Sequence, residues 1–573
     1  MIIFSFPLAL WRSTFTTLAR TALFAHTVYH KLPVGAIYLR RVLPIVSCIE
    51  LLCIKMPVLK LLRILTYLMT VGMLSAQAQP VSQPNVLLIM LDDFRPAIKA
   101  FGDVNAITPN IDRLAQKGYY FTNVFAQQSI CAPSRNSLLT GRRPDTTKLY
   151  DFYSYWREFA GNFTTIPQYF KENGYSTQSI GKIFHPGVSS NYSDDYPLSW
   201  SYVPYHAPTA EFMNKPVCID KATGKLKKNL LCPVVLELQP QGTLPDIQST
   251  AEARTFLKAK RNSSQPFFLA VGYHKPHVPF RIPERYLDLH DVNKFKTLDL
   301  DYPPHGLPSV AWNAYQDLRS RDDIKELNVS FPFGPIPDET KVKIRQHYYA
   351  AVTYVDELIG RLLTEVNFDN TVIVLTSDHG WSLGEHAEWS KFSNYDVALN
   401  VPLIVYSPDI ATRLNNKISR VGELLDLFPT LVELAGLPPV ERCEDASKED
   451  TCVEGKSLLP FIRGGSTSAD ASLDEAFSQY PRPGTYPTVY PNSDKPKLYQ
   501  IQIMGYTMRT ERFRYTAWIG FDPATFKRDW SQLYGEELYD HSIDPKENLN
   551  LLDRPQLGEV KSWLKLRLQQ KFL

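Results

Sequence analysis

The sequence predicts an α/β fold in which helices flank a large, mostly parallel sheet, followed by a smaller C-terminal α+β subdomain with an antiparallel sheet. Continuous apolar runs that end in polar residues predict buried parallel strands at 84–94, 266–277, 370–380 and 401–408. Helical patterns lie between these runs, and the longest covers 342–366, where apolar residues recur at helical spacing. Such alternation is typical of a parallel sheet, whose functional side chains gather at the carboxyl ends of its strands.

The 573 residues are 44% hydrophobic and 21% charged, a composition typical of globular proteins, which excludes a collagen, a coiled coil and a disordered chain. The formal charge of +3 is unevenly distributed, because residues 1–78 hold eight Lys or Arg and a single acid, Glu50. Residues 79–573 hold 54 basic and 58 acidic side chains and are therefore slightly acidic. A basic surface for nucleic acid is not expected, and we predict no nucleic-acid partner.

Residues 1–78 are predicted to be an N-terminal extension that ends in a secretory signal peptide. Residues 55–63 give a positively charged start, and the apolar run that follows closes in Ala76-Gln77-Ala78, so cleavage is expected before Gln79. Because this signal begins at Met56, we predict Met56 as the working start; an uncleaved type II anchor or a transit segment is the alternative. The run is shorter than the roughly 20 apolar residues of a membrane span, and no stable span is expected.

Sequons and cysteines also indicate an oxidising, secretory compartment. The sequons predict N-glycosylation at Asn162, Asn191, Asn262 and Asn328. Five cysteines follow residue 78, and the close spacing of four of them predicts two short-loop disulfides, Cys218–Cys232 and Cys443–Cys452. Cys131 is left without a partner, so its presence requires another explanation.

Acidic residues follow two of the predicted buried strands. Asp92 and Asp93 follow the first, and Asp378 with His379 follows another that is distant in the sequence. Taken alone, an Asp-Asp pair after a strand is most often a loop or a helix cap. Two such pairs at one sheet edge would repel each other unless a divalent cation neutralised them, and oxygen ligands favour Ca²⁺ or Mg²⁺.

Three regions are predicted after the signal peptide: a catalytic domain over 79–462, an exposed linker over 463–475 and a smaller subdomain over 476–573. The linker is predicted from its small, polar and acidic residues. In the last region, the patterns at 501–521 and 536–552 predict an antiparallel sheet and a closing helix.

Cys131 begins the motif Cys131-Ala132-Pro133-Ser134-Arg135, which is followed by a short helical pattern and by Thr-Gly-Arg at 140–142. This motif resembles the signature of type I sulfatases. Further motifs fall in the order of that family, and they lie at 92–93, 181–185, 273–277 and 378–380. The resemblance covers nearly all of 82–573. It implies the alkaline-phosphatase-like sulfatase fold and the oxidation of Cys131 to formylglycine by a formylglycine-generating enzyme.

The resemblance also implies an enzyme, a sulfuric ester hydrolase, and a set of site residues. The implied catalytic residues are Cys131, Arg135, Lys182, His185, His274 and Lys391. The implied metal ligands are Asp92, Asp93, Cys131, Asp378 and His379, with Ca²⁺ as the first choice and Mg²⁺ as the alternative. A hydrated aldehyde offers one hydroxyl to attack sulfur and a second to expel sulfate, while the cation neutralises charge and a histidine transfers protons.

Asp378-His379 stands where many family members have Asp-Asn. This feature, with blocks at 141–158, 165–177, 272–281, 377–394 and 478–483, resembles a branch that removes the 2-O-sulfate from terminal iduronate of heparan and dermatan sulfate in the lysosome. The implied partners are sulfated glycosaminoglycan chain ends, bound by Trp381, Lys391, Arg95 and Lys495. The alternatives are a different glycosaminoglycan specificity, a phosphoester hydrolase, a non-catalytic glycan-binding relative and, for the location, secretion.

Overall fold

The computed structural model describes residues 83–221, 223–295, 302–464 and 474–572. The predicted extension over 1–78, with its signal peptide and the start at Met56, lies outside the described residues, as does most of the predicted linker. Among the residues described, no helix combines the length and the apolar character needed to cross a bilayer.

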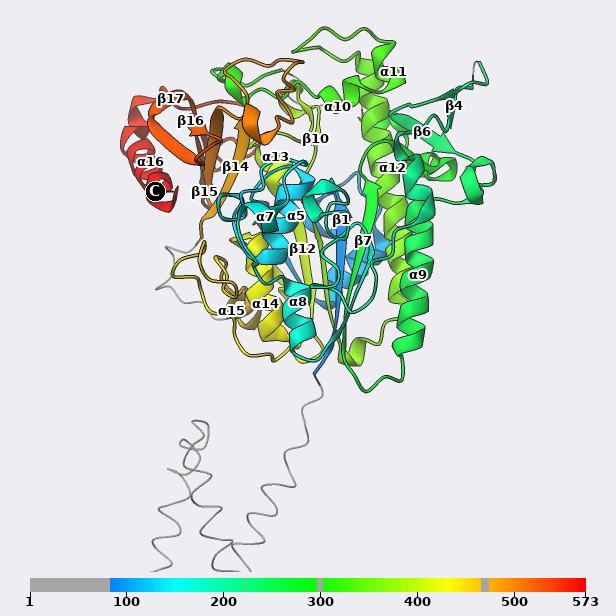
Figure 1. The fold of residues 1–573 in the computed structure, drawn as a ribbon. Helices are drawn as coiled ribbons and strands as arrows, with labels where there is room; N and C mark the ends of the chain where they lie inside the picture. The colour runs from blue at the N-terminus through cyan, green and yellow to red at the C-terminus, as the bar shows by residue number, and fades with distance from the viewer. Residues whose placement is uncertain (1–82, 222, 296–301, 465–473, 573) are drawn as a thin grey trace, which may run out of the picture. The chain divides into compact units, whose positions relative to one another are not determined.

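A seven-stranded sheet forms the centre of the molecule (Figure 1). Its strands, in spatial order, are β13 (Lys417–Glu423), β2 (Tyr119–Phe125), β12 (Asn400–Tyr406), β9 (Thr371–Ser377), β1 (Asn85–Asp92), β7 (Phe267–Pro276) and β3 (Ser176–Gly181). β1 pairs in parallel with both β7 and β9, whereas β12 runs antiparallel to β9 and β2. The mostly parallel sheet is therefore confirmed, but the prediction that the apolar run at 401–408 is a parallel strand is wrong. An apolar run buried on both faces carries no information about direction.

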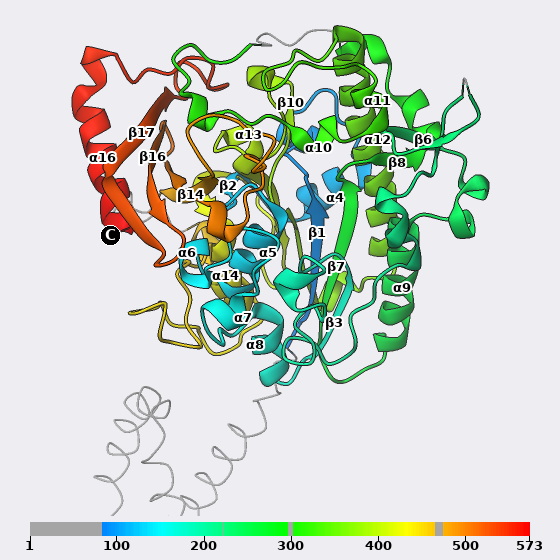
Figure 2. The ribbon, with the colours of Figure 1, turned by 45° about the horizontal axis from the view of Figure 1, so that its top comes forward.

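Helices cover both faces of this sheet. Alternate side chains of β1 point to opposite faces, and each set packs in a separate hydrophobic core. Leu87, Ile89 and Leu91 pack with α4 (Pro109–Lys117), α9 (Pro245–Lys260) and α12 (Asp338–Leu363). Their neighbours Val86, Leu88 and Met90 pack with α5 (Cys131–Thr140), α8 (Ile166–Glu172) and α14 (Leu427–Leu434). Figures 1 and 2 show α9 and α12 side by side on one flank of the sheet. This two-sided burial explains the unbroken apolar sequence of the strands.

The predicted C-terminal antiparallel sheet and its closing helix are confirmed. The sheet consists of β14 (Ala476–Arg482), β15 (Ile503–Arg509), β16 (Phe513–Asp522) and β17 (Lys527–Asp540), each antiparallel to the next. α16 (Gly558–Phe572) packs on β15 and β16 through Leu564, Leu568 and Phe572. Residues from Gln83 onward form one compact unit, and the domain boundaries at 462 and 476 stay a prediction.

Shorter elements complete the chain. The helices are α6 (Pro144–Thr147), α7 (Trp156–Phe159), α10 (Gln316–Arg319), α11 (Asp322–Lys325), α13 (Asp396–Leu399) and α15 (Leu459–Arg463). The strands are β4 (Cys218–Ile219), β5 (Leu226–Lys227), β6 (Leu231–Val234), β8 (Phe280–Pro283), β10 (Ser382–Leu383) and β11 (Trp389–Ser390).

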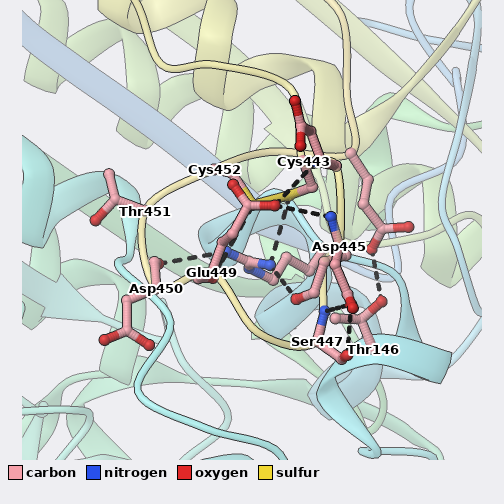
Figure 3. Close-up of a disulfide and its surroundings, with 12 residues drawn as sticks. Thr146, Cys443, Asp445, Ser447, Glu449, Asp450, Thr451 and Cys452 are labelled. Atoms are coloured by element: carbon pink, nitrogen blue, oxygen red, sulfur yellow. Dashed lines mark hydrogen bonds between the residues drawn. A yellow bond between two sulfur atoms is a disulfide. The ribbon is translucent and has the colours of Figure 1, made fainter.

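Both predicted disulfides are present, Cys218–Cys232 between β4 and β6 and Cys443–Cys452 within a surface loop. Figure 3 shows the second disulfide closing the loop that contains Asp445, Ser447 and Glu449. The Arg142 guanidinium lies inside this loop and donates to the carbonyls of Ala446, Glu449 and Asp450. Because Arg142 follows α5, the disulfide loop anchors the C-terminal end of the helix that begins at Cys131.

Candidate active site

The carboxyl ends of four neighbouring strands bring the predicted charged residues together. Asp92 ends β1, Asp378 follows β9, and Lys182 follows β3. β7 approaches the turn of Lys182 so closely that a Cβ at Gly272 would lie 2.0 Å from the Lys182 carbonyl oxygen, so only glycine permits this packing. Asp93 adopts a positive φ of 62°, and its backbone N–H donates to Asp378 Oδ1 at 3.1 Å. The two acidic pairs therefore face each other, as the sequence predicts.

Cys131 lies at the centre of this edge, as the first residue of α5, and it is 1% exposed. Its Sγ lies 3.4 Å from Asp92 Oδ1 and 3.2 Å from Lys391 Nζ. Burial and the neighbouring Asp92 raise the pKa of the thiol to about 12. A thiol in this environment stays protonated at neutral and acidic pH, so the site does not favour a thiolate nucleophile.

Arg135, one helical turn after Cys131, connects the two acidic pairs. Its Nε donates to Asp378 Oδ2 at 2.9 Å, and a terminal nitrogen lies 3.3 Å from Asp92 Oδ1. Burial lowers the pKa of Arg135, but the charges of Asp378 and Asp92 outweigh burial and raise it. A permanent cation therefore holds both carboxylates in place.

Two buried lysines complete the positive side of the site. Lys182 Nζ lies 2.5 Å from Asp92 Oδ2, and Lys391 Nζ lies 2.5 Å from Asp93 Oδ1. Burial lowers the pKa of each lysine, but the neighbouring carboxylates outweigh it, so both side chains stay ammonium ions. Burial raises the pKa of Asp92, but Lys182, His277 and Arg135 together hold it well below its usual range.

Asp93 and His379 have the properties of ligands to a cation. Burial and the nearby Asp92 and Asp378 raise the pKa of Asp93 to about 8 despite Lys391. In the part of the chain that the structure describes, Asp93 Oδ2 and His379 Nε2 are buried without a hydrogen-bond partner. Potential ligand atoms of Asp92, Cys131, Asp378 and His379 lie within 4.8 Å of one another. These residues therefore fit a divalent cation, which would satisfy both orphaned atoms and would favour the ionised form of Asp93.

His379 is in the protonation state that a metal ligand needs. Burial lowers its pKa to about 4, so the ring is neutral. Its Nδ1 lies 2.9 Å from the Gly380 carbonyl oxygen and donates to it. The lone pair is therefore on Nε2, which lies 3.5 Å from Asp93 Oδ1 and 3.6 Å from Asp378 Oδ2.

The structure brings His277 to the acidic pairs, whereas sequence reasoning selected His274 from the same motif. His277 Nε2 lies 3.8 Å from Asp93 Oδ2, and burial lowers the pKa of His277 well below its usual value. His274 instead faces Asp246, with Nδ1 at 3.2 Å from Oδ1. His274 and His277 lie at the two ends of a turn in which the His277 N–H donates to the His274 carbonyl at 2.9 Å, so the course of that turn decides which histidine faces the acidic pairs.

His185 is a second neutral imidazole in the site. Burial, with the charge of Lys182, lowers its pKa well below the usual value. Its ring packs on Phe152 with centroids 4.6 Å apart, and among the described residues its Nδ1 has no hydrogen-bond partner. His185 is therefore a partly buried, neutral group available for proton transfer.

The predicted substrate-binding residues differ in burial and in their ion-pair partners. Trp381 is 1% exposed, and Lys391 Nζ lies 5.9 Å from its ring centroid. Arg95 donates to Glu385 Oε1 at 2.7 Å, and Lys495 pairs with Asp317. Lys391 thus lies beside Cys131 and Asp93, while Arg95 and Lys495 pair with carboxylates that belong to neither acidic pair. All four predicted glycosylation residues, Asn162, Asn191, Asn262 and Asn328, are exposed.

Comparisons with known proteins agree with this geometry. A family model described as Sulfatase matches residues 84–437. The chain is 48% identical over 510 residues to the iduronate 2-sulfatase of Homo sapiens and 46% identical over 508 residues to that of Mus musculus. Each match covers 83% of this chain and 92% of the relative.

Solved structures share the fold at lower identity. One, in complex with its substrate D-glucosamine-2-N,6-O-disulfate, matches with a TM-score of 0.60 at 21% identity, over 85% of this chain and 97% of the other. A phosphonate monoester hydrolase of Agrobacterium radiobacter matches with a TM-score of 0.59 at 21% identity, over 86% of this chain and 96% of the other. The predicted alkaline-phosphatase-like sulfatase fold is thereby confirmed.

Proposed function

Because the chain belongs to the sulfatase family, we propose that it hydrolyses the 2-O-sulfate ester of terminal iduronate in heparan and dermatan sulfate. The observation that carries this specificity is the 46–48% identity to two iduronate 2-sulfatases over 83% of the chain. Family membership makes the chain a sulfuric ester hydrolase, whereas the sugar is an inference from these relatives.

The proposed cofactors are a formylglycine derived from Cys131 and a divalent cation held by Asp92, Asp93, Asp378 and His379. Together they supply a hydroxyl nucleophile of lowered pKa and a Lewis acid for the sulfate oxygens. Arg135 fixes the two acidic pairs at 2.9 and 3.3 Å and so keeps the ligands in place. Lys391 Nζ, 3.2 Å from Cys131 Sγ, faces the position where a sulfate ester would meet residue 131. Its charge opposes the negative charge that develops on the sulfonyl oxygens.

Two partly buried, neutral imidazoles are assigned to proton transfer. His277 Nδ1 donates to the Val278 carbonyl oxygen at 2.6 Å, so the lone pair is on Nε2, which faces Asp93. His277 can therefore accept a proton at Nε2 and return it to the leaving oxygen, as a general base and then a general acid. His185 is the second candidate for this role because it lies beside the charge of Lys182.

The proposed cellular setting follows from the same resemblance. We infer that the chain enters the secretory pathway, is matured by a formylglycine-generating enzyme, is glycosylated at the four exposed asparagines and acts in the lysosome on sulfated glycosaminoglycan ends. Two disulfides support the oxidising compartment.

The proposal is tested with defined disaccharides at acidic pH. We expect turnover of 2-O-sulfated iduronate and little turnover of 6-O-sulfated glucosamine, whereas preference for the glucosamine ester would contradict the specificity. Cys131→Ser should lose turnover of every ester, because a serine has no second hydroxyl with which to expel sulfate. A phosphonate monoester belongs in the same assay because of the fold shared with a phosphonate monoester hydrolase.

A further inference from the structure

A buried lysine that the mechanism does not use lies next to His277 in the chain. Lys275 is 8% exposed and forms no ion pair with any residue that the structure describes. Its ammonium instead donates to two backbone carbonyls, that of His277 at 2.5 Å and that of Pro279 at 2.8 Å. A cation buried without a carboxylate costs free energy, so stability alone does not explain a lysine at this position.

Asp246 forms hydrogen bonds at the start of the turn that contains these two carbonyls, which runs from His274 to Pro279. It is the second residue of α9 and is 2% exposed. Its Oδ1 accepts the backbone N–H of His274 at 2.8 Å, and its Oδ2 accepts the backbone N–H of Lys275 at 3.0 Å. The segment from His274 to Pro279 is thus fixed at its start by a carboxylate and farther along by an ammonium ion.

We propose that Lys275, with Asp246, is a positioning residue that acts through His277 by fixing the turn that presents its imidazole to Asp93. This inference rests on the role of His277 in the proposed function. The His277 ring is oriented by its bond to the Val278 carbonyl, and Val278 lies between the two residues whose carbonyls Lys275 binds. Without the ammonium ion the turn loses this constraint, and a displacement of about 1 Å at a reacting group can cost about 100-fold in rate.

The first experiment compares Lys275→Met with Lys275→Arg on an aryl sulfate, with kcat expressed per formylglycine measured by mass spectrometry. Lys275→Met should lower kcat about 10- to 100-fold with KM near that of the parent, and Lys275→Arg should recover most of kcat. An unchanged kcat in Lys275→Met would overturn the proposal.

Arg281→Met is the matched control. Arg281 is also buried, at 4% exposed, and also donates to backbone carbonyls, those of Thr209 and Phe212. These carbonyls do not belong to the His277 turn, so Arg281→Met should lower the melting temperature and leave kcat unchanged. An equal loss of kcat in both variants would mean that any lost buried cation harms the enzyme, and it would overturn the assignment.

A double-mutant cycle separates positioning from a general structural role. In a His277→Gln background, Lys275→Met should change kcat by less than about twofold, because the group through which it acts is already lost. A second 10- to 100-fold loss would show an effect independent of His277. If Lys275→Met does not fold, Asp246→Asn replaces it in the same cycle, with the same expected and contradicting outcomes.

A crystal structure of Lys275→Met gives an independent measurement. The His277 ring should leave its place beside Asp93, and a ring that stays in place while kcat falls would overturn the proposal. Use of an aryl sulfate keeps this test separate from the sugar specificity. Failure of the parent to cleave 2-O-sulfated iduronate would contradict the proposed function while leaving the cycle readable.

Discussion

Two clusters in this chain contain similar residues. One is buried at the carboxyl edge of the central sheet, and the other is partly buried between the C-terminal sheet and α13. The first includes Asp92, Cys131, Asp378 and His379, and the second consists of Asp396, His541 and Glu547. In each cluster, potential ligand atoms lie within 4.8 Å of one another. Residue type and proximity therefore do not distinguish a metal site from a structural ion cluster.

The surroundings of the carboxylates do distinguish them. In the C-terminal cluster, Arg514 Nε lies 2.5 Å from Glu547 Oε1, and Arg509 Nε lies 2.9 Å from Asp396 Oδ2. Burial raises the pKa of Glu547, but Arg514 and His541 hold it well below its usual range. In the catalytic cluster, by contrast, the pKa of Asp93 rises to about 8. Arg514 therefore keeps Glu547 ionised in the C-terminal cluster. In the catalytic cluster, Asp93 Oδ2 and His379 Nε2 have no hydrogen-bond partner among the described residues, and a bound cation would fill that place.

The largest expected difference between the clusters is in activity. Asp378→Asn should lower kcat/KM about 1,000-fold or more and lose the bound ion, because a catalytic metal contributes several kcal/mol to the transition state. Asp396→Asn is the matched control and should keep both activity and ion. Elemental analysis and kinetics of the two purified variants check this. A variant Asp378→Asn that keeps its ion, or Asp396→Asn that loses it, would reverse the assignment.

The second prediction concerns stability. Arg514→Met removes the cation that balances Glu547 and Glu537, so it should lower the free energy of unfolding by about 3–5 kcal/mol. Activity per folded molecule should stay unchanged, because this cluster contains no catalytic group. Denaturant unfolding followed with an activity assay measures both quantities. A variant that keeps full stability would show that the cluster is not held by its arginines.

A chelator should destabilise the protein through the catalytic cluster alone. Adding Ca²⁺ back at about 100 times its dissociation constant should restore about 2.7 kcal/mol. Asp93→Asn should abolish this ion-dependent shift in melting temperature, whereas Asp396→Asn should retain it. Calorimetric scans with and without Ca²⁺ measure the shift, and a shift that survives in Asp93→Asn would place the ion elsewhere. Repeating the scans with Mg²⁺ compares the two candidate ions.

The sequence predicted the position of a site residue where that residue follows a buried strand. It did not predict positions or strand directions that depend on tertiary packing. Asp92, Asp93, Asp378 and His379 could be placed together because carboxyl ends of parallel strands share an edge. Lys391 has no such local signal and was reached through the family resemblance. Strand direction at 401–408 was missed because burial on both faces removes the periodicity that would reveal an edge or a reversal.

The choice between His274 and His277 shows the same limit. Both belong to one motif, and only the course of the turn after β7 decides which imidazole reaches Asp93. The partners Asp246 and Arg514 were not singled out, because the residues that matter to each lie far away in the sequence. Arg514 forms its ion pairs with Glu537 and Glu547, and the Asp246 carboxylate accepts from His274 and Lys275. A single carboxylate or guanidinium in a sequence carries no sign of such a partner.

A third buried acid is balanced neither by arginine nor by a cation site. Glu388 is fully buried, and its Oε1 accepts the backbone N–H of Asn313 at 2.8 Å. No described residue offers a hydrogen bond to its Oε2. Burial raises the pKa of Glu388 from 4.5 to about 8, so this carboxyl keeps its proton at acidic and neutral pH. Glu388 is thus buried as a neutral, protonated carboxyl group and not as a carboxylate paired with arginine or beside a cation site.

The last expected effect, a dependence of stability on pH, follows from this proton. The pKa of Glu388 is higher in the folded protein than in the unfolded chain, so the stability linked to its proton is fully present below about pH 4.5. This stability is lost as pH rises towards 8, by at most about 1.4 kcal/mol per pH unit. Glu388→Gln removes this loss, so its stability relative to the parent should improve steadily from about pH 5 to about pH 8. Glu385→Gln is the control, because Arg95 holds the pKa of Glu385 below its usual value despite burial and the variant should gain nothing as pH rises. Unfolding free energies at saturating Ca²⁺ measure both curves. A Glu388→Gln curve parallel to that of the parent would show that this carboxyl is ionised in the folded protein.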